Sequence, residues 1–363
     1  MGRAADGHGR LVSPDDHTRI SLEEIYADEG LLAACSEHQI GASEQELLTE
    51  GGSVPAYGET DIEPVVSVLE AVLGRTVSCD DCFYDLGSGS ARLVLSAALF
   101  TPVRKSVGIE LSLTRHEQAE RARALATSRG LLGPSSDAGE LELCYGSLLE
   151  HPLADATLVF CFLIGTGASF QWQQKRHLLR TVPHGAALLL RGQRLPMAEG
   201  ARSFLRDQSS WSVRLLAAST AAPAVVRARV RRLEPRVVTE ISNRMFQFFG
   251  YVLREDELSL SLLAEANPGE DATSRPEAQS SRPVPADAST AAAMEADRRI
   301  GAALARWIEG ECEAFERAGG CRTLTYEQRQ VRLGQTRFER AILLPAGADD
   351  EEEAACVLPP LFS

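Results

Sequence analysis

The chain has 363 residues, with 37 Lys and Arg against 51 Asp and Glu, which gives a formal net charge of −14 at pH 7. A chain of this length can bury a large α/β core, so a minimal scaffold held together by disulfides or metals is excluded. The acidic balance argues against attraction of the whole chain to nucleic acid or to an anionic membrane.

The expected cellular setting follows from what the sequence lacks. No run of eighteen apolar residues is present, and the first twenty residues have no apolar core of a secretory signal. We therefore expect an intracellular protein, in the nucleus or the cytoplasm, with no membrane partner. The 8 cysteines are scattered, which favours reduced thiols. Cys79 and Cys82 form a single C-x-x-C pair without further ligands, so no metal site is predicted.

The N-terminal part is expected to contain two short helices. Residues 1–20 are polar and are predicted to be disordered. Ser21-Leu22-Glu23-Glu24 then has the form of a capping box, and apolar residues at helical spacing follow it. A second short helix is expected at 43–48, so we interpret 21–56 as an N-terminal helical segment.

The central part alternates short apolar runs with amphipathic stretches, which is the pattern of parallel strands joined by crossover helices. This pattern predicts an α/β fold with a doubly wound, Rossmann-like sheet over 57–263. The strands are predicted at 82–86, 106–110, 141–145, 157–162, 186–190, 213–217 and 225–230, and the helices near 91–100, 113–128 and 171–179.

The C-terminal part begins with a stretch dense in Pro, Ser, Ala and acidic residues, which is predicted to be a disordered insertion. A long helix with an apolar stripe and a β-hairpin should follow, before an acidic tail. The segments are 264–290 for the insertion, 291–346 for the extension and 347–363 for the tail, with the helix at 291–317 and the hairpin strands at 329–333 and 338–344.

The most informative motif is Phe83-Tyr84-Asp85-Leu86-Gly87-Ser88-Gly89, an apolar strand that ends in an acid and two alternate glycines. Glycine lets the backbone approach a ligand closely, and open α/β sheets bind ligands at the carboxyl ends of their strands. This indicates a nucleotide-type ligand.

A dinucleotide fingerprint requires glycine where Arg92 stands, and the Asp85 carboxylate would repel a pyrophosphate. S-adenosylmethionine carries a sulfonium and an ammonium group, so Asp85 favours this methyl donor over NAD.

Glu110 ends the second predicted strand about twenty residues after the glycine turn. An acid at that position can bind ribose hydroxyls, both in NAD and in the methyl donor. The alternative is a structural carboxylate that caps the helix expected to start near Ser112.

Residues 83–99, together with Ser106-Val107-Gly108-Ile109-Glu110-Leu111, resemble the class I, seven-strand methyltransferases that depend on S-adenosylmethionine. Within these the chain is most similar to the non-SET histone-lysine methyltransferases of the disruptor-of-telomeric-silencing type. Tyr57-Gly58-Glu59 resembles the donor-binding loop of that family and precedes the glycine motif by a similar distance. The resemblance runs from Tyr57 to about Arg191, which is under half of the chain.

The resemblance implies S-adenosyl-L-methionine as cofactor and a role for each matching residue. Tyr57 and Glu59 would hold the methionine end of the donor, Asp85 and Gly87 would face its amino-acid part, and Glu110 would bind the ribose. No catalytic residue and no metal is assigned. The expected cofactor-binding residues are Tyr57, Glu59, Asp85, Gly87, Ser88, Gly89, Glu110, Leu111 and Ser147.

Three positions depart from the pattern of the family. The third glycine of its G-x-G-x-G motif is Ala91 here, and its Gly-Asp after the third strand is Gly146-Ser147, in which the serine carries no charge. The family's Asn-bearing channel segment corresponds to 159–166, which has no Asn or Asp. The resemblance implies methyl transfer to a protein such as a histone lysine. The alternative is a catalytically degenerate fold that acts as a binding or scaffold protein.

The expected partner is a protein substrate, such as a histone or a nucleosome, and no sequence-specific binding of nucleic acid is expected. Arg227, Arg229 and Arg231 alternate along a predicted strand and so share one face. This face could bind phosphate groups. The preferred interpretation is that it is the solvated face of an edge strand.

Overall fold

The computed structural model describes residues 22–27, 40–50, 60–134, 136–162, 168–191, 211–215, 225–241, 246–261, 288–318, 322–330, 336–344 and 356–357. The chain divides into two compact units. The first comprises Met1–Trp211, Arg232–Arg254 and Gly319–Ser363, and the second comprises Ser212–Arg231 and Glu255–Ala318. The predicted disordered N-terminus and most of the predicted insertion lie outside the described residues.

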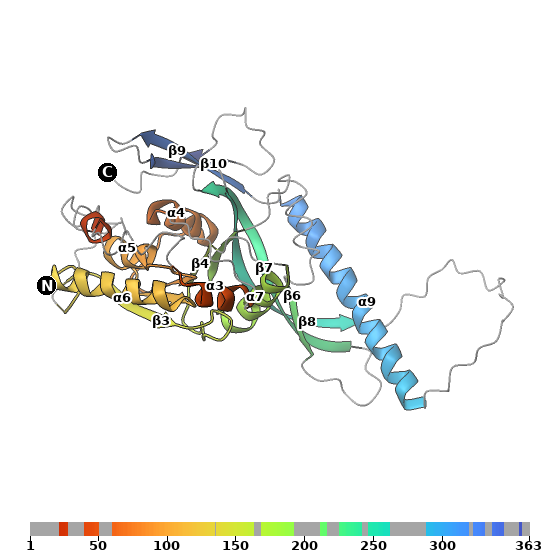
Figure 1. Ribbon diagram of the computed structural model, residues 1–363. Coiled ribbons are helices and arrows are strands. Elements are labelled where there is room, and N and C mark those ends of the chain that lie inside the picture. Colours follow the sequence, from red (N-terminus) through yellow and green to blue (C-terminus); the bar gives the residue numbers. More distant parts are fainter. Residues whose placement is uncertain are drawn as a thin grey trace. The chain divides into compact units, whose positions relative to one another are not determined.

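A largely parallel sheet positions the candidate site (Figure 1). Strands β1 to β5 are mutually parallel in the order β3-β2-β1-β4-β5, and β8 then adds antiparallel to β5, with β7 beyond it. This order confirms the predicted doubly wound fold and places its switch point between β1 and β4. The strands are β1 (Cys82–Leu86), β2 (Lys105–Glu110), β3 (Glu140–Tyr145), β4 (Leu158–Cys161), β5 (Ala187–Arg191), β7 (Val225–Ile241) and β8 (Phe246–Ser261).

Helices cover both faces of this sheet, which is why its central strands are continuous apolar runs. Alternate residues of β1 point to opposite faces: Phe83 packs into the core formed with α4, α5 and α6, whereas Tyr84 packs into the core formed with α7. A short helical stretch at 22–26 adds Leu22 and Ile25 to the first of these cores. The helices are α3 (Ala42–Glu50), α4 (Ile62–Leu73), α5 (Arg92–Phe100), α6 (Leu113–Ser128) and α7 (Ala168–Thr181).

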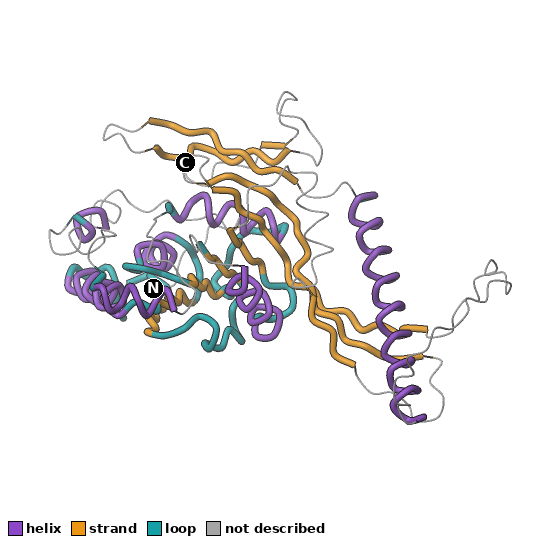
Figure 2. Tube along the Cα trace, turned by 45° about the vertical axis from the view of Figure 1, so that its right-hand side comes forward, coloured by secondary structure: helices purple, strands orange, loops and turns teal. Residues whose placement is uncertain are grey.

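The sequence prediction was wrong about the length of β7 and omitted β8. The predicted strand 225–230 continues through the buried Pro235 to Ile241, and β8 runs beside it (Figure 2). Proline and a dense series of charged residues are both unfavourable signals for an interior strand. Pairing with β8 overrides those local preferences, because the cross-strand neighbours supply hydrogen bonds and ion pairs that the pattern alone does not reveal.

The C-terminal hairpin is confirmed as an antiparallel pair, but its first strand lies earlier than predicted. It consists of β9 (Arg322–Gln330) and β10 (Thr336–Leu344), and β9 also pairs in parallel with β7 at Val237–Thr239. The predicted turn at Gly334-Gln335 lies outside the described residues, as does nearly all of the acidic tail. A short strand, β11 (Cys356–Val357), pairs with β10.

The second unit contains the outer parts of β7 and β8, most of β6 (Trp211–Leu215), and α9 (Ala288–Arg317), which confirms the predicted long helix. Within this unit Ala303 of α9 is buried against Ala228 of β7, with Leu258 and Leu304 beside them. Among the described residues, no helix combines the length and the apolar composition needed to cross a membrane.

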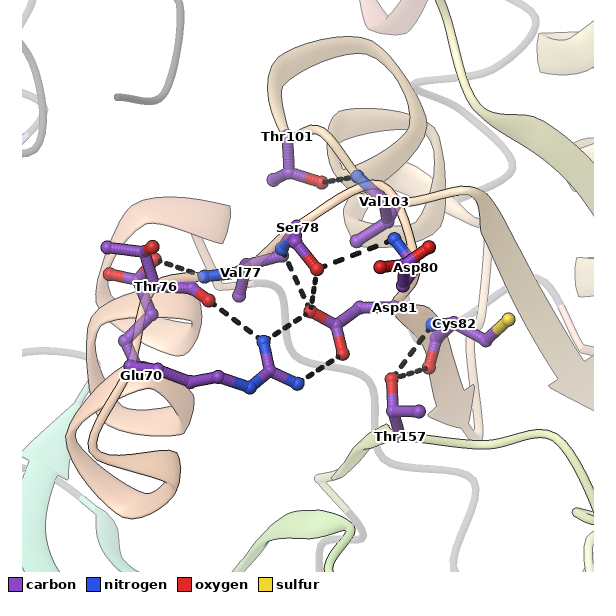
Figure 3. A network of polar contacts seen from close by, with 11 residues as sticks. Glu70, Thr76, Val77, Ser78, Asp80, Asp81, Cys82, Thr101, Val103 and Thr157 are labelled. Carbon is purple, nitrogen blue, oxygen red and sulfur yellow. Dashed lines mark hydrogen bonds and ion pairs between the residues drawn. The ribbon is translucent and has the colours of Figure 1, made fainter. Parts of the chain in front are cut away.

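A buried carboxylate fixes the connection that leads from α4 into β1 (Figure 3). Asp81 is only 1% exposed and accepts two hydrogen bonds from the Arg75 guanidinium at 2.8 Å each. It also accepts from the backbone N–H of Ser78 at 2.8 Å and from the Ser78 hydroxyl at 3.2 Å. Burial alone would raise the pKa of Asp81, but the bonds from Arg75 and Ser78 outweigh it and lower the pKa. This network sets the start of β1, and therefore the point at which β1 ends in the candidate site.

We predict that Asp81→Ala lowers the free energy of unfolding by about 2–3 kcal/mol, because it removes the acceptor of several charge-assisted hydrogen bonds at a buried position. Urea unfolding at pH 7 measures the change. Asp80→Ala is the matched control, since Asp80 is an exposed neighbour, and it should shift stability by less than about 0.5 kcal/mol. Equal losses in the two variants would contradict this role for Asp81.

Candidate nucleotide-binding site

The site is built around the turn between β1 and α5. Gly87 and Gly89 adopt positive φ values of 91° and 56°, which glycine takes without steric cost. The backbone N–H groups of Gly87 and Ser88 both donate to the carbonyl of Ile109 on β2, at 2.9 and 3.1 Å. The turn is therefore held against the end of β2, and its backbone follows the carboxyl edge of the sheet.

Ala91 occupies the third glycine position of the motif in a left-handed conformation, with φ of 62°. It is the one non-glycine residue with positive φ among the described residues. A Cβ there costs about 1–2 kcal/mol relative to the right-handed conformation. The turn thus keeps the backbone path that a glycine would give, so the first departure from the family pattern leaves the geometry of the turn intact.

Gly108, in the middle of β2, is a site residue that sequence reasoning missed. A Cβ built at this position would lie 2.8 Å from the Ser88 hydroxyl oxygen and 2.9 Å from the Ser88 Cβ. Glycine in a strand interior is a known signal for close approach of another backbone, so this position could have been found from the sequence. Gly108 allows the glycine turn to lie directly on β2.

Glu110 ends β2 and is 6% exposed. Its Oε2 accepts from the backbone N–H of Gly89 at 2.7 Å, and its Oε1 accepts from the backbone N–H of Ser112 at 2.8 Å. Burial raises the pKa of Glu110, although these backbone donors oppose the rise. Glu110 therefore bonds to the start of α6, as the alternative prediction expected, and it also bonds directly to the glycine turn. A backbone hydrogen bond from Leu111 also lowers the pKa of Glu110. Of the about four acceptor positions of a carboxylate, about one is then left for a ligand.

Asp85 lies at the carboxyl half of β1 and is 4% exposed. Burial, and in second place the nearby charge of Glu110, raise its pKa to about 8. Among the described residues its carboxyl group accepts no hydrogen bond and has no ion-pair partner. A buried acid without a partner beside a glycine turn is suited to a ligand that brings a cationic donor.

The end of β4 contributes Cys161, which is buried next to Asp85. Its thiol donates to the carbonyl of Leu86 at 3.2 Å, and the side-chain amide of Gln174 on α7 contacts the sulfur at 2.7 Å. Burial and the nearby Asp85 charge raise the pKa of Cys161 well above its ordinary value, so this thiol is not a nucleophile. Cys161 therefore has a packing role next to the end of β1.

The remaining predicted residues fall in three groups. Ser88 and Gly89 are buried in the turn, and Leu111 is half-buried next to Glu110. The Ser147 hydroxyl accepts from the backbone N–H of Leu149 at 3.2 Å, so it takes part in its own turn after β3. Tyr57 and Glu59 lie outside the described residues, as does the part of the channel segment that follows Phe162.

An aromatic pair flanks the same edge of the sheet. Tyr145, the last residue of β3, pairs in register with Glu110 and is 52% exposed. Its ring lies 5.7 Å from the ring of His116 on α6. Large apolar rings that remain exposed at the end of a strand are suited to contact a flat ligand group.

The arginines on β7 are paired with acids within the second unit. Arg227 and Arg229 each contact Glu257 at 3.0 Å, and Glu255 contacts Arg229 at 3.3 Å and Arg231 at 3.1 Å. These cross-strand ion pairs neutralise the basic face, which supports a solvated strand face over a phosphate-binding one. The predicted edge position is wrong, because β7 pairs with β6, β8 and β9.

One group of potential metal ligands has another explanation. The ligand atoms of Glu142, Cys144 and His151 lie within 4.8 Å of one another. However, the Lys105 ammonium already contacts Glu142 at 2.5 Å, and burial and Glu142 raise the pKa of the Cys144 thiol to about 11. Lys105 thus supplies the positive charge at this position, and we assign the group no metal.

The strand order with an antiparallel β8, the glycine turn and the buried acid at the end of β2 are together the features of the class I methyltransferase fold. Residues 44–150 match the model of a family described as "Histone methylation protein DOT1". This part of the chain is therefore similar to the DOT1 family, and the resemblance stated above is confirmed.

Individual relatives cover only part of this chain. A protein named "Protein-lysine N-methyltransferase" from Saccharolobus islandicus is 33% identical over 106 residues, which is 28% of this chain and 60% of that protein. The "Histone-lysine N-methyltransferase, H3 lysine-79 specific" of Caenorhabditis elegans is 27% identical over 138 residues, 37% of this chain and 14% of that protein. The match thus spans less than two thirds of the length of either relative.

Solved structures add a distant likeness. An RNA methyltransferase from Salinibacter ruber, in complex with S-adenosyl-L-homocysteine, is 21% identical, with a TM-score of 0.32. The alignment covers 53% of this chain and 93% of that one. The fold assignment therefore depends on the strand order of this protein itself.

Proposed function

We propose that this protein is an S-adenosylmethionine-dependent methyltransferase that transfers a methyl group to a protein lysine, with a histone as the substrate. The observation that carries the proposal is the pair of buried acids at the glycine turn. Asp85 and Glu110 lie at the ends of adjacent parallel strands, and both have raised pKa values because they are buried. Two buried carboxylates that close to each other are costly unless a ligand uses them.

The chemistry of the two acids fits the two ends of the proposed donor. Asp85 has no partner among the described residues and would receive the ammonium of the methionine part. Glu110 is held by the backbone N–H groups of Gly89, Ser112 and Leu111, and the remaining acceptor capacity of its carboxylate would bind the ribose hydroxyls. NAD would instead bring a pyrophosphate to the turn beside Asp85, where the two negative charges repel.

When bound, S-adenosylmethionine supplies an electrophilic methyl group on its sulfonium. The residues of this chain would orient the donor and exclude water around it, and no side chain that attacks the methyl group is needed. Cys161 and Gln174 support this role, since both are buried and contact each other next to the end of β1. We assign no catalytic residue.

The proposed donor contacts extend along the carboxyl edge of the sheet. Gly87, Ser88, Gly89, Leu111 and Ser147 would complete the contacts there, and Tyr57 and Glu59 would close the methionine end by resemblance to the family. A protein-lysine substrate is supported by the names of the two relatives above, one of which is specific for histone H3. A nucleosome as the physiological partner, and a nuclear location, are further parts of the proposal.

We predict that the wild-type protein binds S-adenosylhomocysteine and that Asp85→Ala and Glu110→Ala each weaken this binding by at least about tenfold. Each variant removes a charge-assisted contact, which contributes about 1.5–3 kcal/mol. Isothermal titration calorimetry measures the dissociation constants. Glu140→Ala is the matched control, because Glu140 is an exposed acid at the other end of β3, and it should bind like the wild type.

Folding of each variant is checked by circular dichroism and urea unfolding. Absence of binding by the folded wild-type protein, or equal affinity in all four proteins, would refute the proposed donor site.

We predict that the wild-type protein labels a lysine of histone H3 when incubated with nucleosomes and the radiolabelled methyl donor. Asp85→Ala should reduce the rate by at least about tenfold at subsaturating donor, because the donor is bound more weakly. Scintillation counting and mass spectrometry of the labelled band give the rate and the residue. Donor binding without label in nucleosomes, free histones or cell lysate would instead establish the non-catalytic alternative.

A further inference from the structure

The N-terminal helix α3 is tied to the start of α6 through one side chain. Glu44, near the beginning of α3, accepts a hydrogen bond from the Ser112 hydroxyl at 2.5 Å. It also accepts from the hydroxyl of Thr114 at 2.5 Å and from the backbone N–H of Thr114 at 3.2 Å. These residues are 68 and 70 positions away in the sequence, so the contact is a tertiary one.

Glu44 is bound firmly at this position. Burial alone would raise its pKa, but the hydrogen bonds from Ser112 and Thr114, together with the Arg115 charge, lower it. The first N–H groups of a helix have no partner within the helix and carry its positive dipole end, so an acid placed there is stabilised. Glu44 thus acts as an N-terminal cap for α6 that is supplied from another part of the chain.

Ser112 connects this cap to the proposed ribose acid. Its hydroxyl donates to Glu44 and accepts from the backbone N–H of Arg115, while its own backbone N–H donates to Glu110. The other oxygen of Glu110 accepts from Gly89 in the glycine turn. The polar contacts therefore run without interruption from α3 to the turn between β1 and α5.

We infer that Glu44 is a positioning residue that sets the affinity for the ribose of the donor by fixing Ser112, and through it the carboxylate of Glu110. This inference rests on the proposed function. Without Glu44, the Ser112 hydroxyl and the Thr114 N–H lose their acceptor, and the first turn of α6 can move. Glu110 would then keep its charge but lose the fixed direction in which its free lone pairs point.

The test compares donor affinity in Glu44→Ala and in Glu46→Ala. Glu46 lies on the same helix, is exposed, and has no hydrogen bond or ion pair among the described residues, so its replacement should leave affinity unchanged. Glu44→Ala should weaken S-adenosylhomocysteine binding by roughly tenfold in calorimetry, the loss expected for one fixed hydrogen bond to a charged group. Thr114→Val, which removes one donor to Glu44 and leaves the helix sequence otherwise intact, should weaken it by roughly threefold.

A double-mutant cycle separates positioning from a general effect on folding. Because Glu44 acts through Glu110, Glu44→Ala should cause no further loss of affinity in a Glu110→Ala background. Affinity equal to wild type in both Glu44→Ala and Thr114→Val, or full additivity with Glu110→Ala, would overturn the inference. A wild-type protein that binds no S-adenosylhomocysteine would instead refute the proposed function, so the two failures are distinct.

Discussion

The site depends on two carboxylates buried side by side at the ends of β1 and β2. Burial and mutual repulsion raise the pKa of Asp85 to about 8, and burial raises that of Glu110. Only one of the two acids is stabilised by the protein's own groups: Glu110 receives backbone N–H bonds from Gly89, Ser112 and Leu111, whereas Asp85 receives none among the described residues. This asymmetry leaves a defined place for a cationic ligand group and a fixed acceptor for hydroxyls.

The surrounding structure serves to bring these two acids together. Parallel pairing sets Asp85 beside Gly108, and the absence of a side chain at Gly108 lets the Ser88 side chain lie against β2. The Asp81 network fixes where β1 begins. Further out, Glu44 fixes the start of α6. Each of these contacts lies outside the ligand space, yet each determines where a ligand-facing oxygen points.

Much of this arrangement could be predicted from the sequence because it depends on local pattern. The strand 82–86 and the helix 113–128 were predicted with the bounds that the structure gives, since apolar runs and a serine cap mark them clearly. The acids Asp85 and Glu110 could be identified for the same reason, because a strand end and a glycine turn fix their positions in space.

The rest depends on contacts between segments that are distant in the sequence. Glu44 is an ordinary acid in a short polar helix, and nothing near it indicates that it caps a helix some seventy residues further on. Likewise, β8 carries a run of charged residues whose ion-pair partners include arginines of β7. Such partners are set by the tertiary fold, so a single sequence without aligned relatives does not reveal them.

The most direct test is the number of protons released when S-adenosylhomocysteine binds at pH 7. A carboxyl group with a pKa of about 8 is about nine-tenths protonated at that pH. A bound ammonium lowers this pKa, so Asp85 should release close to one proton. Calorimetry in buffers of different ionisation enthalpy measures this number. 5′-Methylthioadenosine lacks the amino-acid part and should release none. Equal proton release by the two ligands, or none by either, would contradict the assignment of Asp85 as the acid that receives the donor's ammonium group.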